Sequence, residues 1–202
     1  YGNLARSDEA RPLLEEARRL WHDLGNLPME ADTFFTEASD DFFSGDFDRA
    51  LILSEEARRL SDFTRNLWGQ SCARVIPAMV YFARGETSRA METMSECIRL
   101  GDEGGLLASS VGLRGDLGWL YGQTGERERG LEAARAALAL AAERIPEWKA
   151  VPASVLARLH LLDGNLREAE ALAAETPFLP IPVPFPPYDI SLALARNELA
   201  LA

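Results

Sequence analysis

The sequence predicts an all-α protein, built as a solenoid of about ten antiparallel helices. Three observations lead to this prediction. A glycine-centred pattern returns about every 40 residues, the apolar residues between the glycines keep helical spacing, and sustained strand-like alternation is missing outside one short proline-rich segment. A chain of 202 residues with 47% hydrophobic residues can also bury a substantial core.

The repeating pattern has a glycine at its start and a small residue five positions later. Its four copies are Gly45–Ala50, Gly85–Ala90, Gly125–Gly130 and Gly164–Ala169, so the glycines are 40, 40 and 39 residues apart. A glycine can end a helix in the left-handed conformation without the steric cost of a Cβ atom. The next helix then begins within one or two residues, and the small residue on its inner face lets the two backbones approach. Each copy therefore predicts a tight antiparallel hairpin of helices.

A second repeated segment supports the same period. The hexapeptide Glu15–Leu20 returns letter for letter at Glu55–Leu60, 40 residues later. This match places Ala10 in phase with Ala50, so we expect the chain to open with the second half of a repeat. By the same phase, residues 188–202 are expected to form the first helix of a truncated further repeat. We therefore expect the chain to be a segment of a larger protein.

The apolar stripes between the turns define the helices in order. Leu51, Ile52, Ala57 and Leu60 share one such stripe, which is typical of an amphipathic helix. We expect helices near 8–24, 29–44, 46–61, 65–84, 86–100, 106–124, 126–143, 147–163, 165–175 and 188–202. They form an array over 1–175, with a half repeat at 1–27 and repeats near 28–64, 65–104, 105–144 and 145–175, followed by a Pro-rich linker at 176–187 and the last helix at 188–202.

The turn pattern resembles the central turn of the tetratricopeptide repeat (TPR), and in the third repeat Leu117, Gly118 and Tyr121 precede Gly125 at the spacing of that family. The other three repeats lack this set. The period near 40 exceeds the usual TPR length of about 34 residues and is similar to the TPR-like arrays of large bacterial LuxR-type or cyclase-linked signalling ATPases. HEAT or armadillo repeats share the period but usually lack the turn glycine. The resemblance, over roughly residues 3–175, implies a right-handed α–α superhelix whose first helices face the concave side.

Charge and cysteine usage narrow the functional classes. The formal net charge is -11, from 32 acidic and 21 basic residues, so direct binding to nucleic acid or to an anionic membrane is not expected. No apolar run is long enough to span a membrane, and no signal peptide is visible. The two cysteines are too few for a disulfide framework and fit a reducing, cytoplasmic compartment.

Three segments are irregular. Pro77 lies inside an expected helix, where it predicts a bend or an opened carbonyl facing a ligand. Residues 176–187 are dense in proline, which favours an extended linker over an SH3-type ligand. Residues 30–48 hold seven acids and five phenylalanines but no base. This run predicts either a groove for a cationic partner helix or, as we favour, a phenylalanine core beneath a solvated acidic face.

Catalysis and metal binding find little support in the residue pattern. His22 and His160 lie far apart in a solenoid, and neither has a second ligand at metal spacing. No phosphate-binding loop or nucleophile elbow is present. Cys97 falls where the repeat needs a small buried residue, and Cys72 is expected to be more exposed. We therefore expect no enzyme activity, no metal and no cofactor.

The sequence leaves two functional hypotheses. The leading one is a non-catalytic protein–protein interaction and regulatory scaffold of a larger bacterial signalling or transcriptional regulator, which binds a protein, a peptide or other domains of its own chain. The alternative is a sensor domain that binds a small-molecule inducer in the concave groove, where arginines recognise carboxylate or phosphate. On either hypothesis the expected binding residues lie on first helices or at their borders: Asp32, Phe35, Ser39, Phe42, Arg74, Met79, Arg114, Trp119 and Arg158.

Overall fold

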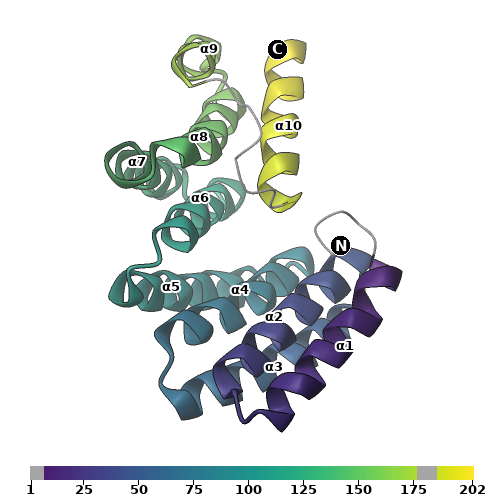
Figure 1. Ribbon diagram of the computed structural model, residues 1–202. Coiled ribbons are helices and arrows are strands. Elements are labelled where there is room, and N and C mark those ends of the chain that lie inside the picture. Colours follow the sequence, from purple (N-terminus) through teal and green to yellow (C-terminus); the bar gives the residue numbers. More distant parts are fainter. Residues whose placement is uncertain (1–6, 177–185) are drawn as a thin grey trace. The chain divides into compact units, whose positions relative to one another are not determined.

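The computed structural model describes residues 7–176 and 186–202, and this part of the chain contains ten α-helices (Figure 1). They are α1 Ser7–Asp23, α2 Leu27–Ser44, α3 Phe47–Thr64, α4 Leu67–Ala83, α5 Thr87–Gly104, α6 Leu107–Gln123, α7 Arg127–Arg144, α8 Ala150–Leu162, α9 Leu166–Glu175 and α10 Pro186–Leu201. Each helix begins and ends within a few residues of its expected range. No strand occurs among the described residues, so the predicted all-α, TPR-like fold class is confirmed.

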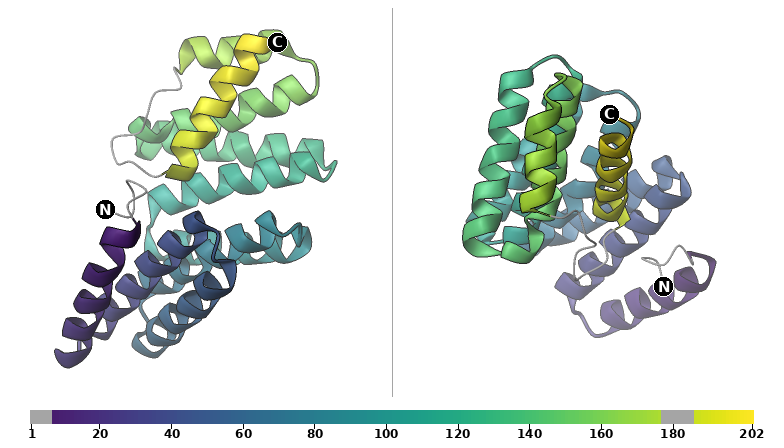
Figure 2. Two further views of the ribbon diagram at one scale, coloured as in Figure 1. Left: turned by 90° about the vertical axis from the view of Figure 1, so that its right-hand side faces the viewer. Right: turned by 90° about the horizontal axis from the view of Figure 1, so that it is seen from above.

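Helices that follow one another in the sequence pack on one another, and they form two compact units. In unit 1, residues 1–106, α2 pairs with α3 and α4 pairs with α5, while α1 packs on α2. In unit 2, residues 107–202, α6 pairs with α7 and α8 pairs with α9. Helix α10 lies alongside α8 (Figure 2). The more detailed repeat boundaries inside residues 1–175 stay a prediction.

The hairpin turns have the predicted geometry. Gly45, between α2 and α3, has a φ of 89°, and the other three turn glycines of the pattern are also left-handed. The small residues Ala50, Ala90 and Ala169 are fully buried. In the third pair the backbones come closest, because a Cβ added to Gly130 would lie 2.7 Å from the carbonyl oxygen of Gly118. Both roles predicted for the pattern, the helix end and the close approach, are confirmed.

Each unit has its own apolar core. In unit 1 the buried residues Ala38, Ala50, Leu53, Ile76 and Val80 join α2, α3 and α4. In unit 2 one cluster centres on Val155, Leu156 and Leu159 of α8, and a second joins α8 to α9 and α10. Over the residues that the structure describes, no helix combines the length and apolarity needed to cross a membrane.

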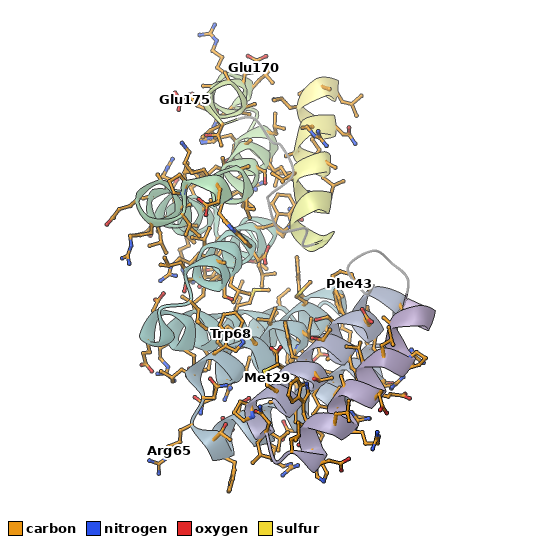
Figure 3. All side chains as sticks on the ribbon, viewed as in Figure 1. Met29, Phe43, Arg65, Trp68, Glu170 and Glu175 are labelled. Atoms are coloured by element: carbon orange, nitrogen blue, oxygen red, sulfur yellow. The ribbon has the colours of Figure 1, made fainter. Side chains whose placement is uncertain are left out.

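Two turns depart from the glycine rule, and one segment cannot be compared. Arg65 ends α3 in the left-handed conformation, with a φ of 54°, and its side chain projects from the turn (Figure 3). After α7 the chain makes a short 3-10 helix, Pro146–Trp148, before α8. Helix α4 continues through Pro77. Of the predicted linker, residues 177–185 lie outside the described part of the chain, and α10 already begins at Pro186.

Candidate functional site

The expected binding residues of unit 1 lie on α2 and α4. Phe35, Phe42 and Met79 are half-buried and pack against the apolar core of this unit. The Ser39 hydroxyl donates a hydrogen bond to the carbonyl oxygen of Phe35 at 3.1 Å. Asp32 is also half-buried, and its charge helps to raise the pKa of the nearby Cys72 thiol. The structure thus brings these residues onto neighbouring first helices, where the apolar ones also hold the helices together.

Arg74 and Arg114 have the same local structure in the two units. In each, Nη1 donates a hydrogen bond to the carbonyl oxygen four residues earlier, that of Gln70 at 2.6 Å and that of Ser110 at 3.1 Å. Arg74 also lies 3.9 Å from a carboxylate oxygen of Asp62. The two arginines belong to different units, so each is a candidate within its own unit only.

The expected binding residues of unit 2 form a compact cluster on the first helices α6 and α8, together with α10. The Arg158 guanidinium stacks over the Trp119 ring, 3.8 Å from its centroid. Its Nε and Nη2 donate hydrogen bonds to the two carboxylate oxygens of Glu198, at 2.8 and 3.0 Å. A stacked arginine that also holds a carboxylate by two parallel hydrogen bonds is a geometry suited to anion recognition. In this structure the anion is the chain's own Glu198.

A buried ionic cluster between α1, α2 and α3 was missed by the sequence analysis. Arg11 lies 3.1 Å from Asp41, Arg18 lies 2.9 Å from Glu37, and Arg49 lies 3.4 Å from Asp41. The two carboxylates are almost completely buried. The spacing carried a signal, because Arg11 and Arg18 are seven residues apart and the two acids are four apart, so each pair shares one helical face.

This cluster corrects the prediction of a solvated acidic face. Four of the seven acids in residues 30–48 are buried, namely Glu30, Glu37, Asp40 and Asp41, and among them Glu30 lies 3.2 Å from His22. The phenylalanine part was nearer to the structure, since four of the five pack against the core of unit 1. The acids are buried because the long arginine side chains of α1 and α3 cover them and supply opposite charge.

The buried acids are only partly satisfied. One oxygen each of Glu37, Asp40 and Asp41 is buried without a hydrogen bond. Burial raises the pKa of Asp40, with a further rise from the charge of Asp41, and burial likewise raises the pKa of Asp41 against the opposing pull of Arg49 and Arg11. A void of about 10 Å³ adjoins the three acids, which is at the lower limit for one water molecule. The arrangement fits a structural cluster holding one buried water.

Groups that carry nucleophilic or metal chemistry are poorly placed for it. Cys72 is buried, contrary to expectation, and so is Cys97. Burial is the main cause that raises the pKa of both thiols to about 12, so neither forms a thiolate near neutral pH. His22 and His160 belong to different units. In the described part of the chain, no group of three or more His, Cys, Asp or Glu residues is arranged to hold a metal ion.

Comparison with known proteins supports the fold through structure rather than sequence. No protein-family profile and no curated protein matches the sequence. Among solved structures, BtubC (BKLC) from P. vanneervenii matches with a TM-score of 0.72 and 19% identity, over 99% of this chain and 85% of that one. Two structures from Podosopora anserina, named "putative kinesin light chain nearly identical TPR-like repeats", match with TM-scores of 0.65 and 0.63, at 17% and 16% identity, over 100% of this chain and 92% of theirs. At these identities the comparison establishes the TPR-like fold alone.

Proposed function

We propose that this chain is a non-catalytic protein–protein interaction and regulatory scaffold domain of a larger bacterial signalling or transcriptional regulator in the cytoplasm. The observation that carries the proposal is the TPR-like fold, since stacked helix pairs of this kind generally bind proteins on extended faces. The repeat period near 40 residues supports the regulator branch. Buried thiols with a raised pKa and histidines in separate units support a function without catalysis.

The first helices are the proposed binding elements. In unit 1 they offer half-buried aromatic and sulfur-containing side chains next to polar groups, a combination common at the centre of protein interfaces. The net charge of -11 favours a partner whose contacting surface is basic. Other domains of the same regulator, or a separate protein, would meet these requirements.

A site-specific crosslinking experiment tests this proposal. A photoreactive amino acid replaces Ser39, on the first helix α2, in the full-length regulator inside cells. The matched control replaces Ile52, an exposed residue on the second helix α3. We expect a specific crosslinked partner, or a crosslink to another domain, from position 39 and not from position 52. Equal crosslinking from both positions, or none from position 39, would contradict the proposed surface.

A small-molecule sensor is the second candidate, and one observation favours it. Arg158 is stacked on Trp119 and binds the carboxylate of Glu198 through two hydrogen bonds, so a carboxylate or phosphate of an inducer could take the place of Glu198. Because Glu198 belongs to α10, such an exchange would couple ligand binding to the position of that helix. This gives a sensor a mechanical output within unit 2.

Thermal unfolding against a panel of sugars, nucleotides, amino acids and organic acids tests the sensor. A ligand at a hundred times its dissociation constant stabilises the folded state by about 2.7 kcal/mol, which gives a clear shift. We expect Glu198→Gln to strengthen the response to an anionic ligand and Arg158→Met to abolish it. A panel without any hit, or a hit that is unchanged in Arg158→Met, would rule out this site.

A further inference from the structure

Helix α1 has an apolar face that no described helix covers. Leu13, Leu20 and Leu24 lie on one side of the helix, at intervals of seven and four residues. Leu20 and Leu24 are 46% and 72% exposed. Three leucines in register on one helix face are unlike the scattered apolar residues of an ordinary protein surface.

The internal repeat shows what kind of element fits this face. The same hexapeptide that contains Leu20 recurs in α3, where its last residue, Leu60, is only 6% exposed. The difference is that α3 is paired with α2, the first helix of its own repeat. Since the two segments are identical in sequence, the open face of α1 has the shape and chemistry to receive a first-type helix.

The open face extends onto α2. Met29, Thr36 and Phe43 recur every seven residues along α2, and Met29 and Phe43 are exposed near its two ends (Figure 3). The residue of α4 that is equivalent to Thr36, 40 positions later, is Ile76, which is buried in the core where α2, α3 and α4 meet. A helix seated between α1 and α2 would therefore be held as α2 is held between α3 and α4.

Helix α10 is a first-type helix with an uncovered face of its own. Leu192 and Ala195 are buried in the cluster formed with α8, in the manner of one first helix packing beside another. Leu194 and Leu201, seven residues apart on a different side, are 42% and 88% exposed. Ala193, Asn197 and Ala200 lie between these two sides, and small residues at such positions let a second-type helix approach closely.

We propose that a second copy of this chain covers the open face of α1 and α2 with its α10, so that the chains associate head to tail. Helix α10 of one copy then stands in the place of the first helix that α1 lacks. Ala193, Asn197 and Ala200 meet the leucines of α1, and Leu194 and Leu201 meet Met29 and Phe43 of α2. The contact is heterologous, because each copy contributes a different surface.

The charges near the two faces are compatible with this contact. On α1, Arg19 is paired with Glu16 and Asp23 of the same helix. On α10, Glu198 is paired with Arg158 of its own copy. Neither face therefore has to bury an unpaired charge when the two meet. The apolar area is modest, so the association is expected to be reversible and to depend on concentration. This contact is separate from the partner surface proposed above.

Sedimentation velocity on the 202-residue chain tests the proposal, with variants at each end. Wild type is expected to sediment as a 22.3 kDa monomer at about 1 μM and as larger species at about 100 μM. Leu20→Glu blocks the acceptor face on α1, and Leu201→Glu blocks the donor face on α10. Each variant alone is expected to stay monomeric at about 100 μM. Ile52→Glu, an equivalent change on an exposed leucine-sized side chain outside both faces, is expected to associate like wild type.

Mixing the two blocked variants identifies the contact as head to tail. The Leu20→Glu chain keeps an intact α10 and the Leu201→Glu chain keeps an intact α1, so an equal mixture is expected to form a discrete one-to-one dimer. Circular dichroism of each variant confirms that the helices are retained. The proposal is overturned by a wild type that stays monomeric at about 100 μM, by a mixture that forms no dimer, or by loss of association in Ile52→Glu.

Discussion

Two glycines on α6 provide the sharpest test of the packing. A Cβ added at Gly118 would lie 2.8 Å from the carbonyl oxygen of Gly130 and 3.2 Å from the amide nitrogen of Ala134. Both are backbone atoms of α7, so Gly118→Ala forces the two helices apart. Overpacking of this kind costs up to about 3 kcal/mol, while the higher helix propensity of alanine returns about 1 kcal/mol. We expect a net destabilisation of about 2 kcal/mol.

Gly115→Ala is the matched control on the same helix. Its added Cβ would meet nothing closer than Cγ2 of Val155 at 3.7 Å, an ordinary contact. Helix propensity alone then predicts a stabilisation of about 0.5–1 kcal/mol. Urea unfolding followed by circular dichroism measures both variants, and hydrogen exchange of the α6 and α7 peptides locates the effect. If Gly118→Ala proved as stable as wild type, the close approach of α6 and α7 would be wrong.

Three further predictions concern single positions. Arg65→Gly is expected to stabilise the protein by about 0.5–1 kcal/mol, because glycine adopts the left-handed turn without a Cβ cost, and an unchanged urea midpoint would contradict that turn geometry. Burial raises the pKa of Asp116 to about 7, so the folded state keeps a proton that the unfolded state loses near pH 4, and stability falls as pH rises from about 4 to 7. Asp116→Asn is therefore expected to raise the urea midpoint more at pH 8 than at pH 5, and an equal effect at both would refute the shift. Arg49→Met removes the charge 3.4 Å from Asp41 and is expected to cost about 1–3 kcal/mol at pH 7 and less at pH 5, where the acid protonates more readily, whereas Arg59→Met, at an exposed ion pair, should leave the midpoint nearly unchanged.

The fold was largely predictable because its signals are local. A glycine that ends a helix and a small residue five positions later act within one turn, and both Gly45 and Ala50 have the conformation and burial that this pattern requires. Helical periodicity then located every helix to within a few residues. The period of about 40 residues related the pairs to one another without any knowledge of distant contacts.

The candidate sites were less predictable because they depend on contacts between helices. The sequence placed Trp119 and Arg158 on one surface, and they do stack, but it contained no sign that Glu198 would occupy the guanidinium. Likewise, the acids of α2 were expected to face solvent. Arginines from α1 and α3 reach over Glu37 and Asp41, and an ion pair between helices has no fixed spacing in the sequence.

The hexapeptide at Glu15–Leu20 and Glu55–Leu60 separates the two levels most clearly. The sequence alone determined that both segments are helical and that Leu20 and Leu60 lie on the apolar side of their helices, because backbone propensity and periodicity are properties of neighbouring residues. Only the tertiary structure decided that Leu60 is buried and Leu20 exposed. Burial requires a second element to exclude water from the apolar side, and α2 covers α3 at that place while no described helix covers the same face of α1.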